Sequence, residues 1–273
     1  GYLPDPNIVA TDIQAQLKEN LNITVNIEVM ESGAFLAASD AGQLQGIHLL
    51  GWGADYPDQT NFLGYHFGAG ASKQFGDHWD DITSALASGA QLADDAEREP
   101  FYTTANNAIR THVPMIPVAH GGSALAFKAS VEGAFASPLG NEEFSVMSNG
   151  TDTFVWMQNA EPISLYCADE SDGESLRACE QVTQSLLSYE TGGTAVEPAL
   201  AESYEVNADL TEWTFHLRPG VLFHDGSSFD ANDVVVSLSI QWDAANPLHT
   251  GNTGAFSYWS GLFGAFLNAP PAQ

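Results

Sequence analysis

The sequence predicts an α/β fold in which helices alternate with the strands of a parallel sheet. Two observations carry this prediction. Hydrophobic residues make up 44% of the 273 residues, which is typical of a globular chain with its own core. Residues 7–52 alternate between helical and strand periodicity, and that order of elements is typical of parallel α/β sheets. Ligands of such sheets bind beyond the carboxyl ends of the strands.

The first elements are predicted from their apolar spacing. Residues 7–21 predict a helix with one apolar face, formed by Ile8, Val9, Ile13 and Leu17. Residues 23–30 alternate as a half-buried strand does, with Val25, Ile27 and Val29 on one side. Residues 32–42 predict a short helix, and residues 46–52 a buried strand.

The middle of the chain predicts helices followed by a crossing segment. Residues 77–113 predict two helices, the second with Phe101, Ala105 and Ile109 on one face. Residues 114–121 predict a strand edge flanked by prolines. Residues 137–154 are polar and contain glycine, which indicates a linker.

The last part of the chain predicts a second set of strands and helices. Residues 153–158 predict a strand, and residues 175–190 predict a long helix. Residues 212–242 predict a strand with Trp213, Phe215 and Leu217 on one face, a Pro-Gly turn, a second short strand and a helix. Asp230 or Asn232 is the expected N-cap of that helix.

The charge of the chain excludes several classes of partner. There are 35 Asp and Glu against 7 Lys and Arg, a formal net charge of −28. Such a surface repels phosphate backbones, which excludes nucleic acids, and it disfavours docking on anionic lipids. The acidity is explained either by solvation of the surface or by a role in binding a ligand.

The sequence has neither the pattern of a membrane span nor that of a signal peptide at its start. No stretch approaches the roughly 18–20 apolar residues of a membrane span. The sequence opens on GYLPDPN rather than on a signal-peptide pattern, so we expect any export signal to have been removed or to lie outside this sequence.

The two cysteines, Cys167 and Cys179, predict either a disulfide or two buried thiols. They have no CxxC pair and no His-rich tract beside them, which argues against a metal site. A disulfide between them would close a short loop and contribute about 3 kcal/mol by loop-entropy arguments. It would also imply an oxidising compartment.

Four long motifs carry a family resemblance. Residues 198–238 and 244–262 resemble the N-terminal signature of the family-5 solute-binding proteins of ABC importers, the dipeptide, oligopeptide and nickel group. Residues 51–63 and 94–120 resemble the C-terminal part of the same family. The segments stand in inverted order, and a middle section is missing. The chain is therefore a circularly permuted half, an engineered arrangement, or segments joined in the wrong order.

The resemblance implies a two-lobe periplasmic-binding-protein-like fold (type II, cluster C), partial or circularly permuted. Residues 1–118 would form a second-lobe segment, residues 119–148 the crossover and linker, and residues 149–273 a first-lobe segment. The implied function is the capture of peptides in an interlobe cleft for delivery to an ABC transporter permease. Oligosaccharides, nickel chelates and opines are alternative ligands. The implied protein is a monomeric periplasmic or extracellular lipoprotein without a cofactor.

The candidate ligand-binding residues follow the predicted strand 46–52. In relatives the aspartate of the ADY motif receives the α-ammonium of the peptide, a role that the resemblance assigns to Asp55. Trp52 would form a pocket wall, Gly53 and Ala54 would offer backbone groups, and Tyr56 completes the motif. The alternative is that Asp55 caps a turn and Trp52 lies in the core, while Asp58 is expected to be a turn residue. Ser171, Asp172 and Gly173 are either ligand contacts or part of a solvated loop.

Enzyme motifs are not found in the sequence. There is no GxSxG elbow, HExxH motif, P-loop or GxGxxG motif, and HGGS at residues 120–123 is only superficially similar to an oxyanion loop. A binding protein is therefore favoured over the runner-up, a secreted hydrolase that uses two carboxylates.

Overall fold

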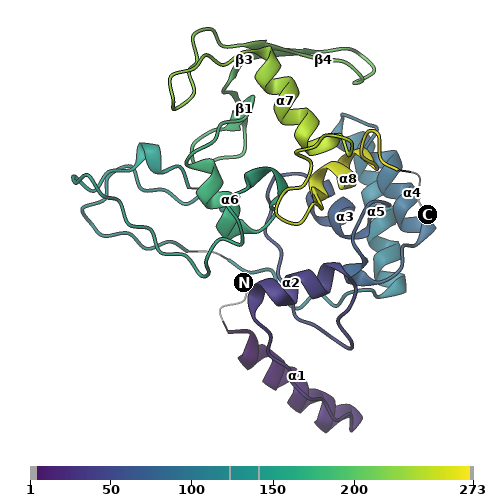
Figure 1. The fold of residues 1–273 in the computed structure, drawn as a ribbon. Helices are drawn as coiled ribbons and strands as arrows, with labels where there is room; N and C mark the ends of the chain where they lie inside the picture. Colours follow the sequence, from purple (N-terminus) through teal and green to yellow (C-terminus); the bar gives the residue numbers. More distant parts are fainter. Residues whose placement is uncertain (1–4, 123, 141, 271–273) are drawn as a thin grey trace. The chain divides into compact units, whose positions relative to one another are not determined.

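The computed structural model describes residues 5–122, 124–140 and 142–270. The chain divides into two compact units (Figure 1). The first holds the described residues up to Gly53 together with Ser72–Asp77, and the second holds Ala54–Ala71 and the described residues from His78 onward. The boundary falls inside the GWGADY motif, so each unit is described by itself.

The first unit contains helix α1 (Pro6–Leu21), helix α2 (Ser32–Asp40) and one turn of 3-10 helix, η1 (Lys73–Phe75). Both predicted helices are confirmed. α1 begins where the Asp5 carboxylate accepts hydrogen bonds from the backbone N–H of Asn7 and Ile8. It ends at Asn22, whose left-handed φ of 55° closes the last turn.

The strands expected at residues 23–30 and 46–52 are wrong. Within the described residues, neither segment takes part in a β-ladder. Val29 is 75% exposed and Ile47 is 73% exposed, so their apolar side chains also have no sheet to cover. Alternation of apolar residues favours a strand, but a strand forms only where a second strand satisfies its backbone groups.

The strands expected at residues 114–121 and 153–158 are also wrong, because neither segment forms a strand in the structure. The parallel sheet predicted from the sequence is therefore not found in the described part of the chain. The coarser prediction holds, because the chain mixes helices and strands.

Three helices form the best packed part of the second unit: α3 (Gln59–Phe67), α4 (Asp80–Gly89) and α5 (Asp95–His112). The two helices predicted within residues 77–113 are confirmed. Their contact buries a core formed by Phe67, Ile82, Ala85, Leu86, Tyr102, Ala105, Ala108 and Ile109. Gly89 allows the close approach, since a Cβ there would lie 3.2 Å from the Tyr102 ring.

The rest of the second unit holds short helices and two hairpins. The helical elements are η2 (Phe144–Val146), η3 (Cys167–Asp169), α6 (Gly173–Glu180), α7 (Ala231–Trp242) and α8 (Ser257–Phe263). The strands β1 (Leu187–Tyr189) and β2 (Val196–Pro198) pair antiparallel, as do β3 (Ala201–Val206) and β4 (Trp213–Leu217). The capping box of α7 uses Asp230 and Asp233, which decides between the two expected caps.

The long helix predicted for residues 175–190 is too long, because α6 ends at Glu180. The Thr183 hydroxyl donates to the carbonyl of Cys179 at 2.8 Å, and Leu187–Tyr189 pairs with β2. The apolar periodicity continues past Glu180, but β-branched residues after the helix disfavour its extension. Residues 187–189 instead form a strand, because β2 offers a pairing partner.

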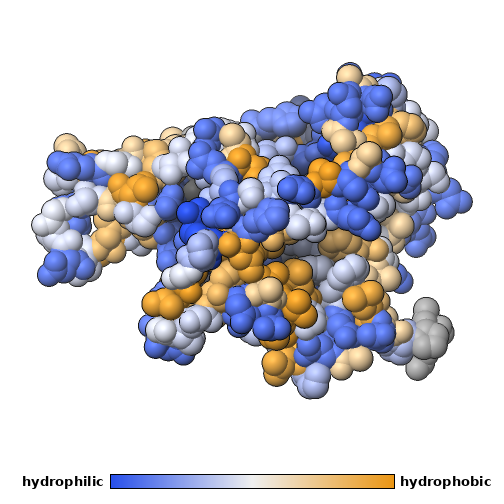
Figure 2. Space-filling view, turned by 90° about the horizontal axis from the view of Figure 1, so that it is seen from above, coloured by the Kyte–Doolittle hydropathy of each residue, from blue (hydrophilic) through white to orange (hydrophobic). Residues whose placement is uncertain are grey.

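Many hydrophobic side chains lie at the surface. Figure 2 shows them among hydrophilic residues, and the most exposed include Met157 at 92% and Val155 at 81%. Among the described residues, no helix is both long and apolar enough to cross a membrane.

Candidate functional site

The candidate motif continues from the first unit into the second. Trp52 and Gly53 end the first unit, and both are partly buried. Ala54, Asp55 and Tyr56 begin the second unit and lead into α3, which starts after Asp58. The geometry of the site is therefore built from Asp55 onward.

Asp55 is held by one side chain from nearby in the sequence, Asn61, and by one from a distant part of the chain, Tyr258. Its backbone N–H donates to Oδ1 of Asn61 at 3.1 Å. Its carboxylate accepts a hydrogen bond from the hydroxyl of Tyr258, which lies on α8. Asn61, which is fully buried, also donates to the Tyr258 hydroxyl at 3.3 Å. These contacts fix the direction of the Asp55 side chain.

The surroundings of Asp55 are unfavourable for its negative charge. Burial raises the pKa of Asp55 to about 7, and the charges of Glu180 and Asp172 add to the effect. In the described part of the chain, no lysine or arginine forms an ion pair with this carboxylate. A cationic group placed against Asp55 would offset the cost of burying its charge and the repulsion from Glu180 and Asp172.

Tyrosines connect Asp55 with the predicted loop 171–173. The rings of Tyr65 and Tyr258 lie 5.4 Å apart, and those of Tyr56 and Tyr258 lie 6.0 Å apart. The hydroxyl of Tyr65 is 3.3 Å from Oγ of Ser171. Two candidate segments separated by more than a hundred residues thus meet within the second unit.

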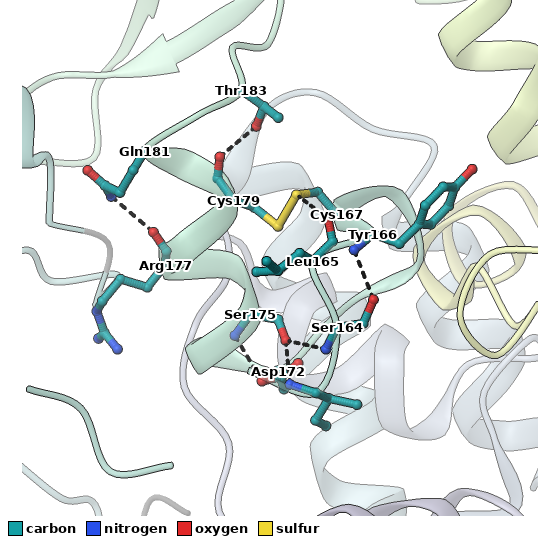
Figure 3. Close-up of a disulfide and its surroundings, with 11 residues drawn as sticks. Ser164, Leu165, Tyr166, Cys167, Asp172, Ser175, Arg177, Cys179, Gln181 and Thr183 are labelled. Carbon is teal, nitrogen blue, oxygen red and sulfur yellow. Dashed lines mark hydrogen bonds between the residues drawn. A yellow bond between two sulfur atoms is a disulfide. The ribbon is translucent and has the colours of Figure 1, made fainter. Parts of the chain in front are cut away.

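The loop that carries Ser171 is braced by a disulfide between Cys167 and Cys179 (Figure 3). Asp172 begins α6, since its Oδ1 accepts a hydrogen bond from the backbone N–H of Ser175 at 3.0 Å. Oδ2 of Asp172 is buried and finds no hydrogen-bond partner among the described residues. Gly173 is the first residue of α6. Asp172 therefore acts both as a cap and as a source of negative charge.

Asp58 has a structural role. Its carboxylate forms a bidentate ion pair with Arg98 of α5, at 2.6 and 2.9 Å, and it accepts from the backbone N–H of Thr60. Burial acts to raise the pKa of Asp58, but the hydrogen bonds from Arg98 and Thr60 outweigh it and hold that pKa below its ordinary value. Asp58 therefore caps the start of α3 and links it to α5; the sequence predicted a turn residue here but not the ion pair with Arg98.

The sequence analysis missed the aromatic and amide partners of Asp55. Tyr258 is 203 residues away from Asp55, and no local pattern predicts a contact across that distance. Asn61 and Tyr65 lie on one turn and the next of α3, and helical spacing from Asp58 could have identified them as neighbours of the motif. Among the described residues, no group of His, Cys, Asp or Glu side chains is arranged to hold a metal ion.

Comparison with known proteins gives the chain relatives among bacterial binding proteins. The family model of bacterial extracellular solute-binding proteins, family 5, matches residues 195–259. Heme-binding protein A of Haemophilus influenzae is 36% identical over 122 residues, which is 42% of this chain and 22% of that protein. The dipeptide-binding protein of Escherichia coli is 41% identical over 83 residues, or 28% of this chain and 16% of that protein.

Di/tripeptide-binding protein 4 of Pseudomonas aeruginosa is 35% identical over 91 residues, 31% of this chain and 17% of that protein. No solved structure gives a significant match. The chain thus spans about a fifth or less of the length of these relatives. All of them are named as binding proteins rather than enzymes. Residues 195–259 are thus similar to the bacterial extracellular solute-binding proteins, family 5, and the relatives that match parts of the chain carry the names of binding proteins.

Proposed function

We propose that this chain is part of the substrate-binding component of an ABC importer and captures peptides by their free α-ammonium group. The observation that carries the proposal is the carboxylate of Asp55. It is partly buried, has a pKa of about 7 and has two further acids near it. A carboxylate in these surroundings gains from a bound cation far more than an exposed one does.

The chemistry of the contact favours an ammonium group. Asp55 already accepts one hydrogen bond, from Tyr258, and its remaining lone pairs are available for N–H donors of a ligand. Hydrogen bonds between an ammonium and a carboxylate contribute about 1.5–3 kcal/mol each. Binding of the cation would lower the pKa of Asp55, so the ionised form would be favoured in the complex.

The named ligands of the relatives are consistent with a peptide, but they also include heme. A heme carries two propionate groups, which Asp55, Asp172 and Glu180 would repel. Oligosaccharides offer no ammonium group to pair with Asp55. The acidic surroundings of Asp55 therefore favour a dipeptide or oligopeptide over these alternatives.

The remaining parts of the proposal follow from the family. The complete protein would have two lobes with the ligand between them, residues 1–118 contributing to the second lobe and residues 149–273 to the first, joined through residues 119–148. A partial or circularly permuted order of the segments is part of the same proposal. The complete protein would be a monomer in the periplasm or at the cell surface, tethered as a lipoprotein, and would deliver its ligand to a membrane permease.

Calorimetry on the 273-residue chain tests the proposal, with alanyl-alanine as the ligand. Replacing Asp55→Asn removes the charge that receives the ammonium, so binding should weaken by about 1.5–3 kcal/mol, roughly 10- to 150-fold. N-acetylated alanyl-alanine should lose a similar amount against the wild type and little more against the variant.

Asp209→Asn is the matched control, because Asp209 is exposed and the change in net charge is identical. Asp58→Asn is unsuitable, since it would also break the ion pair with Arg98. The proposal fails if the wild type does not bind the dipeptide, if both variants weaken binding equally, or if acetylation has no effect.

A further inference from the structure

A small cavity lies beside Asp55 in the second unit. Its volume is about 150 Å³. Its walls come from the disulfide-bearing loop 167–171, from Leu176 of α6, from Gln241 of α7 and from residues 257–259 of α8. Tyr258 lines the cavity and also donates its hydroxyl to Asp55, so the two places share a wall.

The two acids of this cavity have different surroundings. Asp169 accepts hydrogen bonds from the backbone N–H groups of Thr253, Gly254 and Phe256, at 2.6, 2.8 and 2.7 Å. Its carboxylate is therefore fully used in holding the segment that leads into α8. Gly251 leaves room for it, since a Cβ there would lie 2.3 Å from Oδ2 of Asp169.

The carboxylate of Glu170 has fewer partners, which are the side chains of Ser164 and Asn252. Glu170 is only 9% exposed, and its Oε1 is buried without a hydrogen-bond partner in the described part of the chain. Burial is the main cause that raises the pKa of Glu170. The hydrogen bonds with Ser164 and Asn252 act against the rise, and the charge of Asp172 adds to it. A buried carboxylate oxygen without a donor costs free energy unless a ligand or water supplies one.

The rest of the cavity wall suits a short hydrocarbon chain. Ala168, Leu176 and Trp259 contribute apolar surface. Gln241 is already engaged, because its Oε1 accepts from Nε1 of Trp259 at 2.9 Å. A volume of 150 Å³ holds about five water molecules at ~30 Å³ each, and the side chain of lysine has a similar number of heavy atoms.

We propose that this cavity receives the side chain of the first residue of a bound peptide and selects a basic one, with Glu170 accepting hydrogen bonds from its terminal cation. The inference rests on the proposed function, since the peptide's own α-ammonium is assigned to Asp55. Tyr258 connects the cavity with that contact, because it lines the cavity and donates its hydroxyl to Asp55.

A pair of dipeptides tests this selectivity on the 273-residue chain. Lysyl-alanine and norleucyl-alanine have the same four carbons in the first side chain, and only lysyl-alanine carries a terminal ammonium group on them. The wild type should bind lysyl-alanine about tenfold more tightly or better, the effect of one charge-assisted hydrogen bond. Glu170→Gln should bring the two dissociation constants together while norleucyl-alanine binds as before.

Glu161→Gln is the matched control for the overall charge of the chain, since Glu161 is exposed. It should keep the preference for lysine, and so should a measurement at high salt, which screens the distant charges. Equal affinities of the wild type for both dipeptides, or a preference that survives Glu170→Gln, would overturn the inference and leave the peptide-binding function intact.

A second measurement separates the cavity from the proposed function. n-Butylammonium chloride, the lysine side chain without its peptide, is titrated into the chain while the Glu170 carboxyl carbon is followed by NMR. A saturable shift of this resonance supports the cavity even if no dipeptide binds. The inference is overturned if the resonance of Glu170 does not respond.

Discussion

Asp55 and Asp58 carry the same side chain three positions apart, yet their pKa values shift in opposite directions. Asp58 has Arg98 as a partner, and the ion pair keeps it ionised. Asp55 has a tyrosine hydroxyl and two neighbouring acids, and its pKa rises to about 7. The sequence could identify Asp55 as a candidate from its motif, but not its environment, because Tyr258, Asp172 and Glu180 come from distant positions.

The raised pKa of Asp55 predicts a stability that falls as the pH rises. The folded chain holds the Asp55 proton up to about pH 7, whereas the unfolded chain releases it near the ordinary value of 3.8. Between these values the folded state binds more protons, so the free energy of unfolding decreases with rising pH, by up to about 1.4 kcal/mol per pH unit for this group.

Asp55→Asn should remove this contribution. Urea denaturation of the wild type and of the variant between pH 5 and pH 8 measures it, and the difference between the two isolates Asp55 from the other titrating groups. The wild type should lose stability more steeply than Asp55→Asn over this range. Parallel curves would mean that Asp55 is not perturbed.

At the scale of elements, the sequence predicts what is decided locally. α1, α4 and α5 have clear apolar spacing, and Asp230 has the local sequence of a capping box. The strand predictions at residues 23–30 and 46–52 are wrong because a strand depends on a partner that local alternation does not reveal. The end of α6 was missed for the same reason, since β2 pairs with residues that were expected to continue the helix.

The disulfide is the element-scale feature with the clearest energetic consequence. Cys167 and Cys179 tie the loop before α6 to the end of that helix, next to Ser171 and Glu170. Reduction should lower the free energy of unfolding by about 3 kcal/mol, because the unfolded chain regains the entropy of the open loop. Urea denaturation with and without dithiothreitol measures the change.

The double variant Cys167→Ser/Cys179→Ser serves as the control. It should have the stability of the reduced wild type and should not respond to dithiothreitol. If thiol labelling shows that both cysteines of the wild type are fully reduced while its stability is unchanged, the disulfide contributes nothing to the fold.

At the scale of the whole molecule, the composition limits the classes of partner but does not predict the architecture. The net charge of −28 excludes nucleic acids and disfavours anionic lipids as partners, and the acids near Asp55 favour cations at that one place. Screening over about 8 Å at physiological salt makes the overall charge nonspecific. Specific binding of a cation therefore depends on the few acids that lie near Asp55 and Glu170.

The central claim is that Asp55 is a perturbed carboxylate which receives the ammonium of a peptide. The most direct test is an NMR titration of the Asp55 carboxyl carbon in the 273-residue chain, with and without saturating alanyl-alanine. The free chain should give a pKa of about 7, and the dipeptide should lower it markedly because the bound cation favours the ionised form. A pKa near 4 in the free chain, or a value that the dipeptide leaves unchanged, would contradict the account.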